Sequence, residues 1–398
     1  MITVIANNTK YTNFKSISLD MSLEKASRRF SLTAPSSSLD NLPIKTGDQI
    51  KILVDGEQRF FGYVERSSRS QTQGNDIFHL SGRSVTADMI DSRVDHRVQF
   101  SGRKSLRTVA DTLFRYLMSQ PLPQDDIEAD PPPGFVSRAD PLEFRVVVDE
   151  DIDDYLDDDL MEAEIGETYF EVLERFSKKR QVLLTTNGYG DLVFTRGRGG
   201  LATPFKIRNL RTNRSNNFLK EMEVVYDASH RYNTYDANSQ PSKGAIRKIS
   251  DITPDGLIIG DGRAIDDEIR ISRKMFFIAE SPSNAYECQN RATWEAIVAR
   301  SRSVRYSVTL AGHSFKGNVW DSNISVDVLD EYANIEAKML VNSVSFSETI
   351  DGGESTSLTC LPPNAFTFPE KPLEGKIGTP GETGRVYSYR PIGGWEGE

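Results

Sequence analysis

Carboxylates are the side chains of this sequence whose density first suggests chemistry. A run rich in Asp and Glu, DEDIDDYLDDDLMEAE, extends from Asp149 to Glu164. Clustered carboxylates can bind calcium, but an EF-hand loop needs glycine at its sixth position and glutamate at its twelfth. No register of this run supplies both residues. We therefore interpret the run as a solvated acidic loop, with contact to a basic partner as the alternative.

The side chains that most often bind metals are scattered along the chain. No two histidines have the HxxxH or HExxH separation that places a pair of imidazoles on one helical face. The two cysteines form neither a disulfide framework nor a metal-binding motif. The sequence therefore predicts no metal site and no cofactor at these residues, which are His79, His96, His230, His313, Cys288 and Cys360.

Motifs for nucleophilic or phosphate chemistry are also missing from the sequence. No serine lies in a G-x-S-x-G motif, and the short stretches GYG and GRGRGG lack the lysine of a phosphate-binding loop. A glycoside hydrolase needs two carboxylates across a cleft. With 58 acidic residues among 398, some pair always looks suitable, so such a pair indicates nothing. We expect a protein that is not an enzyme.

Composition limits the classes of function further. The formal net charge of -10 argues against binding to nucleic acid through charge. No apolar run is long enough to span a bilayer. The first residues, MITVIANNTKYTNF, lack the basic and apolar regions of a signal peptide, and two cysteines suit a reducing compartment. We expect a soluble protein that is assembled in a cytoplasm.

The elements that must position these residues change in kind along the chain. Residues 1–95 alternate apolar and polar side chains between turn clusters, among them Asp55-Gly56, which predicts antiparallel β-strands. Residues 96–205 predict a small α+β unit. It contains an amphipathic helix within 104–118 and a loop rich in Pro and Asp at 120–135.

Two further elements complete the α+β unit. A second helix is predicted to begin after Thr168, because Glu171 lies three positions on and completes a capping box. The segment QVLLTTNGYGDLVFTR, residues 181–196, predicts a β-hairpin that turns at Asn187-Gly188. The stretch RGRGG that follows is predicted to be a loop.

Residues 206–365 return to β, with one helix that Asn284 and Glu287 cap. The segment FLKEMEVVYDASHRYNTYDA, residues 218–237, is predicted as one long alternating stretch. Residues 366–398 are poor in apolar side chains and predict an extended tail. Its aromatic and apolar residues either anchor a partner or occur by chance in a disordered end; they are Tyr387, Tyr389, Pro391, Ile392 and Trp395.

Two segments far apart in the chain repeat one pattern. Residues 64–72 align with residues 341–349 so that a valine, two alternate serines and a threonine coincide. Each segment follows a strand that contains Val-Asp, and each precedes a turn that contains glycine and a further strand. We interpret this order as two related β domains that flank the α+β unit.

These segments resemble the baseplate hub proteins of contractile-tailed bacteriophages, the Mu-like hub and late control D proteins. The resemblance rests on FFGYVERSSRS with HLSGRSVTADMIDSRV, on IGETYFEVLERFSKKRQVLLTTNGYGDLVFTR, and on AKMLVNSVSFSETIDGGESTSLTCLPP. Together these stretches span most of residues 1–365. None is a catalytic fingerprint, and the tail after residue 365 does not match the family's pattern.

The resemblance implies an α+β, mainly β fold with two tail-tube-like antiparallel β domains, residues 1–95 and 206–365, around the α+β accessory domain. It implies a homotrimer whose six tube-like domains form a pseudo-sixfold ring. That ring would join the sixfold tail tube to the threefold central spike, beside other baseplate proteins of the virion. Genome DNA would pass through its axial channel without specific binding. No part of the protein would insert into a membrane.

The polar continuations of the two repeated strands are the candidate subunit contacts. They comprise Glu65, Arg66, Ser68, Arg69, Ser70, Ser345 and Ser347. Two functions of other classes remain open: a tail-associated peptidoglycan hydrolase, and a tail protein that binds a glycan or receptor. A tail-like bacteriocin or a type VI-like device would use the same architecture as a phage tail.

Overall fold

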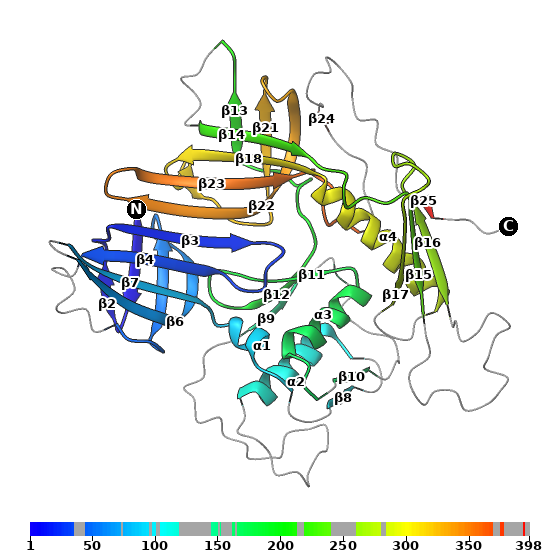
Figure 1. Ribbon diagram of the computed structural model, residues 1–398, viewed down its shortest axis with the longest axis horizontal. Helices are drawn as coiled ribbons and strands as arrows, with labels where there is room; N and C mark the ends of the chain where they lie inside the picture. Colours follow the sequence, from blue (N-terminus) through cyan, green and yellow to red (C-terminus); the bar gives the residue numbers. More distant parts are fainter. Residues whose placement is uncertain are drawn as a thin grey trace, which may run out of the picture.

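Alternating apolar side chains build a large sheet that has fourteen described strands, from both the N-terminal and the C-terminal half of the chain, as the computed structural model shows (Figure 1). Its main path has the strand order β14-β18-β23-β22-β3-β4-β7-β6-β5-β1-β2. The structure describes residues 1–35, 44–72, 75–94, 98–100, 104–118, 145–149, 152, 161–163, 165–212, 219–239, 260–279, 284–368, 375–377 and 393–394.

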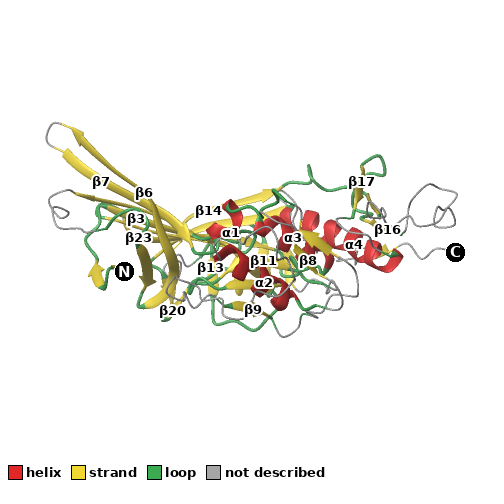
Figure 2. Ribbon diagram, turned by 90° about the horizontal axis from the view of Figure 1, so that it is seen from below, coloured by secondary structure: helices red, strands yellow, loops and turns green. Residues whose placement is uncertain are grey.

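The N-terminal strands form an antiparallel unit, as predicted. They are β1 (Ile2–Ala6), β2 (Thr9–Tyr11), β3 (Ser16–Ser22), β4 (Arg29–Pro35), β5 (Gln49–Val54), β6 (Glu57–Thr72) and β7 (Asn75–Ser84). Asp55 and Gly56 have φ of 48° and 87°, so the predicted turn has the two left-handed residues of a tight hairpin. Strand β6 is the longest in the chain, and with β7 it projects from the body of the molecule (Figure 2).

The α+β unit packs two small sheets, β10-β8 and β11-β12-β9, and helices around a core of its own. Its elements are α1 (Ala87–Asp91), β8 (Val98–Phe100), α2 (Leu106–Met118), β9 (Val146–Val148), β10 (Met161–Ala163), α3 (Tyr169–Lys179), β11 (Leu183–Thr186) and β12 (Leu192–Thr195). The predicted capping box is confirmed: the Thr168 hydroxyl accepts from the amide of Glu171 at 3.1 Å, and the Glu171 carboxylate accepts from the amide of Thr168 at 2.8 Å.

Removal of this cap is a first testable prediction. We expect Thr168→Ala to lower the free energy of unfolding by about 1 kcal/mol, because one amide at the start of α3 loses its acceptor. Urea unfolding followed by circular dichroism measures the change. Thr9→Ala, at an exposed threonine of β2, is the control and should stay within about 0.5 kcal/mol of the wild type. Equal effects of the two substitutions would contradict the prediction.

The hairpin of the α+β unit forms and turns at Asn187-Gly188 as predicted, but the connection is longer than these two residues. Thr186 pairs with Leu192, so the connection spans residues 187–191. The Asn187 side chain holds it by accepting from the amides of Tyr189 and Asp191 at 2.9 and 3.1 Å. Gly188 is required for another reason: a Cβ there would lie 2.4 Å from the carbonyl oxygen of Gln58 on β6.

The acidic run lies largely outside the described residues, but its described parts are not all loop. Strand β10 lies within it and pairs with β8. Asp149 forms an ion pair with Arg198 at 2.6 Å. The prediction of one solvated loop over the whole run is therefore wrong for residues 161–163, where a short strand closes the α+β unit.

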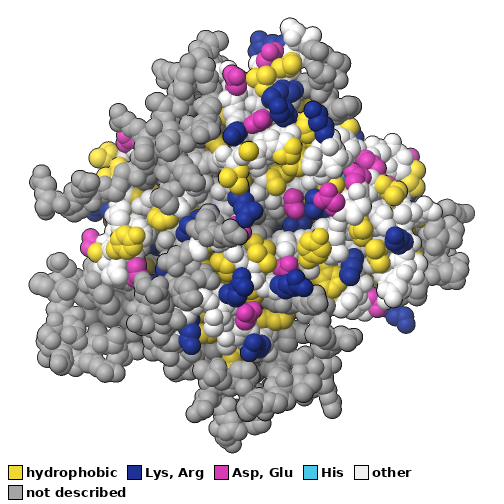
Figure 3. Space-filling model, turned by 180° about the vertical axis from the view of Figure 1, so that it is seen from behind, with side chains coloured by type: hydrophobic (Ala, Val, Ile, Leu, Met, Phe, Trp, Pro, Cys, Tyr) yellow, Lys and Arg dark blue, Asp and Glu magenta, His cyan; other side chains and the backbone are white. Residues whose placement is uncertain are grey.

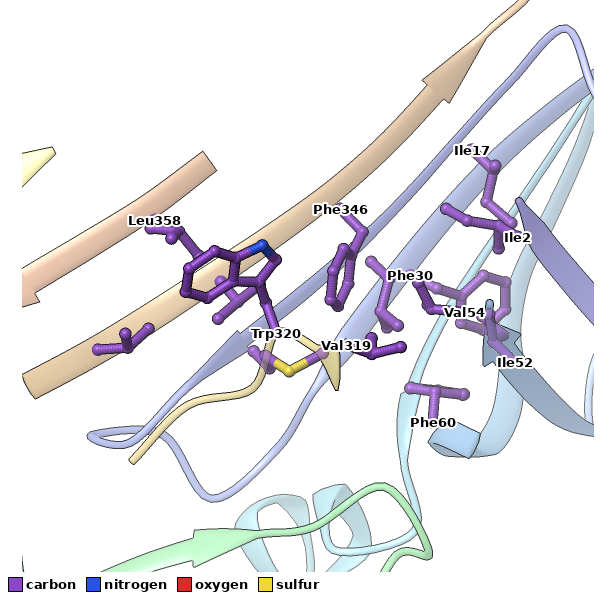
Figure 4. Close-up of a cluster of buried hydrophobic side chains, with 14 of the residues drawn as sticks. Ile2, Ile17, Phe30, Ile52, Val54, Phe60, Val319, Trp320, Phe346 and Leu358 are labelled. Carbon is purple, nitrogen blue, oxygen red and sulfur yellow. The ribbon is translucent and has the colours of Figure 1, made fainter. Parts of the chain in front are cut away.

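The C-terminal half supplies the rest of the large sheet. Its strands are β13 (Lys206–Asn209), β14 (Leu219–Tyr226), β18 (Val304–Ala311), β21 (Ile324–Asp330), β22 (Ile335–Thr349), β23 (Gly353–Leu361) and β24 (Gly375–Ile377). The separate hairpin of β19 (Ser314–Phe315) and β20 (Asn318–Val319) contributes Phe315 and Val319 to the same hydrophobic core. These strands and those of the N-terminal unit share one hydrophobic core, in which Phe30, Phe346 and Trp320 are buried (Figure 4).

The predicted continuous stretch over 218–237 is wrong, because the chain leaves the large sheet after Tyr226. It enters a second, four-stranded sheet of β15 (Thr234–Asn238), β16 (Asp261–Ile265), β17 (Lys274–Ile278) and β25 (Gly393–Gly394). Helix α4 (Ala285–Arg302), capped by Asn284 and Glu287 as predicted, packs on this sheet with a separate core (Figure 1). Residues 227–303 are thus an excursion between β14 and β18.

The predicted extended tail begins too early at residue 366. Phe366, placed in the tail by the sequence, is completely buried and packs with Leu23, Trp294 and Leu340. Beyond it, strand β24 (Gly375–Ile377) pairs with β22, and β25 pairs with β16. The predicted docking residues Tyr387, Tyr389, Pro391, Ile392 and Trp395 lie outside the described residues.

Candidate assembly surfaces

The two halves of the large sheet repeat one arrangement of strands. Strands β14-β18-β23-β22-β21 follow the same antiparallel order as β3-β4-β7-β6-β5. The strand registers match the two repeats residue by residue. Phe30 and Leu32 of β4 correspond to Tyr306 and Val308 of β18. All four side chains are buried.

A β-bulge marks the same place in both repeats. The register of β6 on β7 shifts between Val64 and Arg66, and that of β22 on β23 shifts between Val341 and Ser343. In the sequence alignment Val64 coincides with Val341, so the bulges coincide as well. Because a bulge bends and twists its strand, both long strands change direction after the buried valine. This shared irregularity supports the interpretation of a duplicated unit.

Within one chain, the two repeats are joined by the segment of β22 that follows the bulge. Residues Ser343–Thr349 of β22 pair antiparallel with Ser16–Ser22 of β3, in a register that sets Ser345 opposite Asp20 and Ser347 opposite Ser18. The Ser345 hydroxyl donates to the Asp20 carboxylate at 2.5 Å. Ser345 and Ser347 therefore bind the first repeat of their own chain, and their prediction as subunit contacts is not supported.

The equivalent half of β6 has no such partner among the described strands. The pairing of β5 with β6 ends at Tyr63, and on the side opposite β7 no described strand pairs with Arg66–Thr72. Arg66, Arg69 and Ser70 are exposed. An unpaired strand edge is a template for another strand, and here the projecting hairpin presents it (Figure 2).

At the far end of the sheet, β14 presents the matching edge. It occupies the place in the second repeat that β3 occupies in the first, and it is the terminal strand of the path. Its inward side chains are only partly buried, although they pack on the large core; they are Leu219, Met222, Val224 and Tyr226. Ile17, Leu19 and Met21 of β3, which correspond to the last three of these, are buried under β22.

The two edges carry opposite charges. The distal half of β6 contains Arg66 and Arg69, while β14 contains Glu221, Glu223 and one lysine, Lys220, and is followed by Asp227. Opposite charges across paired strands stabilise the pairing, and like charges destabilise it. Glu65, at the bulge, is held within its own chain by Arg83 at 2.6 Å, and the same Arg83 guanidinium binds Asp91. Glu65 is therefore a predicted contact residue that already has an ionic partner inside the subunit.

A buried arginine ties the repeats to the α+β unit. The Arg28 guanidinium, only 4% exposed, donates to the carbonyl oxygens of Thr186 and Arg59 at 3.1 and 2.8 Å and to Asp321 at 3.1 Å. Burial lowers the pKa of Arg28 from its ordinary value, and the carboxylate of Asp321 opposes this effect. One side chain thus connects three parts of the chain that lie far apart in sequence.

The two cysteines and a cavity beside α4 are further groups whose surroundings bear on chemistry. Burial raises the pKa of Cys288 to about 11 and that of Cys360 to about 12, so both thiols are protonated at neutral pH. A cavity of about 400 Å³ beside α4 is lined by Asp227, His230 and Glu295 among others. The pKa of Asp227 is lowered by hydrogen bonds from Ser229, and Glu295 forms an ion pair with Arg291 at 2.6 Å.

The histidines also occupy different surroundings. His79 is exposed on β7 and lies 3.1 Å from the Thr33 hydroxyl, His230 is exposed in a turn, and His313 is buried. His96 lies outside the described residues. Within the described ranges, no helix is both long and apolar enough to cross a membrane. Basic and acidic side chains are interspersed over the described surface of the face in Figure 3.

Three family models match successive parts of the chain. Residues 1–84 match the N-terminal part of the Mu phage baseplate assembly protein GpP-like family, and residues 139–196 match the second domain of the baseplate hub protein gp44-like family. Residues 284–370 match the fourth domain of the Mu phage baseplate assembly protein GpP. Baseplate hub protein gp44 of Escherichia phage Mu is 24% identical over 376 residues, which cover 92% of this chain and 89% of that protein.

Solved structures share the fold along nearly the whole chain. A 43 kDa tail protein of prophage MuSo2 from Shewanella oneidensis superposes with a TM-score of 0.70 at 24% identity, covering 92% of this chain and 98% of that one. A tail protein from Neisseria meningitidis gives 0.72 at 15% identity, covering 92% and 97%. A type VI secretion component of E. coli, described as similar to T4 tail proteins gp27 and gp5, gives 0.51 at 9% identity, covering 90% and 76%.

Proposed function

This chain belongs to the family of Mu-like baseplate hub proteins, which are structural components of phage tails, and from that premise we propose that it acts as a homotrimeric ring at the centre of the baseplate. Each subunit contributes two tube-like repeats, residues 1–86 and residues 206–226 with 304–361. Six repeats then surround an axis, which matches the sixfold tail tube above to a threefold spike below. DNA passes through the channel at ejection.

The proposal rests on one difference between β6 and β22, which is whether the segment after the bulge pairs with another strand of the same chain. After the bulge, β22 binds β3 of the same chain, while β6 presents the same half of the strand to solvent. β14, the counterpart of β3, ends the sheet at the other side. If β6 binds β14 of the next subunit as β22 binds β3, each junction around the ring has the same geometry. The contact is head-to-tail, and such contacts close into a ring when the rotation from one subunit to the next closes on itself.

The internal junction also predicts the register between subunits. Ser68 corresponds to Ser345 and Val225 corresponds to Asp20, so Ser68 faces Val225 of the next subunit. In the same register, Ser70 faces Glu223 and Arg66 faces Asp227. The pairing covers the half-exposed Met222, Val224 and Tyr226, which removes apolar surface from water.

Disulfide trapping tests the ring and its register together. We expect Ser68→Cys with Val225→Cys to give covalent trimers under mild oxidation, because directly opposed Cβ atoms lie about 4.5–5.5 Å apart in antiparallel strands. Non-reducing electrophoresis and light scattering measure the product. Ser68→Cys with Lys220→Cys is the matched control, since Lys220 lies five residues away on β14 and should leave the protein uncrosslinked.

Two results would reject the proposal. One is a wild-type protein that remains monomeric in light scattering both alone and with its cognate spike protein. The other is efficient crosslinking in the Lys220 control but not in the Val225 pair, which would exclude this register. We also propose that the protein has no enzymatic activity and that its partners are the spike, the tail tube and other baseplate proteins.

A further inference from the structure

A buried histidine lies beside two glutamates at the junction of the two repeats. His313 follows β18, Glu348 is near the end of β22, and Glu354 is near the start of β23. A ring nitrogen of His313 and carboxylate oxygens of both glutamates all lie within 4.8 Å of one another. His313 is 1% exposed, and the glutamates are half-buried. No short sequence motif predicts this cluster, because 35 residues or more separate His313 from the glutamates.

Hydrogen bonds determine which nitrogen of His313 carries the proton. The Thr356 hydroxyl donates to the carbonyl oxygen of Gly312 at 2.7 Å, so its single hydrogen is used there. The same hydroxyl oxygen lies 3.2 Å from Nδ1 of His313 and must accept the Nδ1 proton. Nε2 is then left with a lone pair. That atom is buried and has no hydrogen-bond partner among the described residues.

The imidazole is also held in orientation. Its ring packs edge to face on Phe346, with ring centroids 5.3 Å apart. Metal-binding histidines usually donate their second ring nitrogen to a neighbouring acceptor, which fixes the tautomer and the direction of the lone pair. Thr356 supplies that acceptor here. Burial lowers the pKa of His313, and the ammonium of Met1 adds to this effect, while the nearby carboxylates oppose it.

The charges around Nε2 favour a cation. Three carboxylates face the group: Glu348, Glu354 and Asp55 of the β5–β6 turn. The ammonium of Met1 lies 2.6 Å from Asp55 and from Glu354 and neutralises part of this charge. The Glu348 carboxylate accepts from the amide of Ile2 at 2.7 Å, which orients it. An excess of two negative charges remains beside an unprotonated nitrogen.

We propose that His313 Nε2, Glu348 and Glu354 form a binding site for a divalent transition-metal ion of the zinc class. One imidazole and two carboxylates are ligands that zinc accepts, and a water molecule completes four coordination positions. Zinc ligands lie about 3.4 Å apart when each bond is about 2.1 Å, so modest rotations of the glutamate side chains close the site. All three ligands belong to the second repeat, and the ion lies beside β1 and the β5–β6 turn of the first repeat, whose Ile2 and Met1 contact the two glutamates.

The test measures zinc binding by the full-length chain with an unmodified N-terminus, after treatment with EDTA and dialysis. We expect titration with zinc chloride to show one site per chain, a rise in thermal midpoint, and a zinc absorption-edge spectrum with one imidazole. Magnesium chloride should produce none of these, because magnesium prefers oxygen ligands. His313→Leu should abolish the site and its imidazole signature.

Further variants separate binding from folding. Glu348→Gln and Glu354→Gln keep the side-chain volume and should each weaken zinc binding about tenfold or more, while Thr356→Val, which acts through the tautomer of His313, should weaken it about 10–100-fold. His79→Gln, at an exposed histidine, is the matched control and should bind as the wild type does. The proposal is overturned if wild-type protein binds no zinc, or if His79→Gln rather than the site variants removes it. Neither result depends on trimer formation.

Discussion

Ser70→Glu combined with Arg66→Glu is expected to convert the proposed trimer into a monomer. In the proposed register each new glutamate faces an acidic residue of the next subunit, Glu223 and Asp227 respectively. Like charges brought together at an interface cost several kcal/mol. Two such pairs at each junction should weaken association at least about 100-fold. Light scattering across a concentration series measures the shift from trimer to monomer.

The same position supplies the control. Ser70→Lys adds a side chain of similar length with the opposite charge, and it should leave the trimer intact because it faces Glu223. Adding Glu223→Lys to Ser70→Glu should restore association, since the two charges are then exchanged. A trimer that resists the double glutamate variant would place the contact elsewhere. Equal loss from Ser70→Lys and Ser70→Glu would show that bulk, and not charge, disrupts the junction.

Arg28→Ala is expected to cause the largest loss of stability among single substitutions at the connection between the units. The change leaves the carbonyl oxygens of Thr186 and Arg59 without their donor, and it removes a charge partner of Asp321. Removal of one partner from a buried ion pair typically costs about 3–5 kcal/mol. Urea unfolding followed by tryptophan fluorescence should show an earlier midpoint, because buried Trp320 reports on the shared core.

Two further variants distinguish the possible causes of this loss of stability. Arg28→Met keeps most of the side-chain volume, so it should be less destabilising than Arg28→Ala if part of the cost comes from the cavity. Arg305→Met removes an exposed arginine of β18 and should change the free energy of unfolding by no more than about 0.5 kcal/mol. If Arg28→Ala behaves like Arg305→Met, the buried hydrogen bonds do not hold the units together.

Local sequence signals predicted the elements where the chain itself supplies the cause. The capping residues Thr168 and Asn284 mark the first turns of α3 and α4, because a side-chain acceptor and a glutamate three positions later satisfy the same amides. Strict alternation identified β3, β4 and β5 for a similar reason, since one face of each is buried. The prediction of a single stretch over 218–237 failed because alternation continues across the turn between two sheets.

The repeat was visible in the sequence, but its consequence was not. The aligned serines of β6 and β22 look equivalent, so the sequence assigned both to subunit contact. In the structure, Ser345 and Ser347 face β3, while Arg66 and Ser70 remain exposed. Strand partners depend on which edges the rest of the chain covers, and no local pattern contains that information.

Sequence patterns alone were enough to identify a mainly β chain with a duplicated strand pattern and two capped helices. They also showed the resemblance to tail hub proteins. Tertiary structure decided what the duplicated strands are used for. It also decided that His313, Glu348 and Glu354 meet. Periodicity and capping act between residues a few positions apart, so sequence reveals them. Edge pairing and ligand clusters join residues hundreds or tens of positions apart, and only the folded chain brings those together.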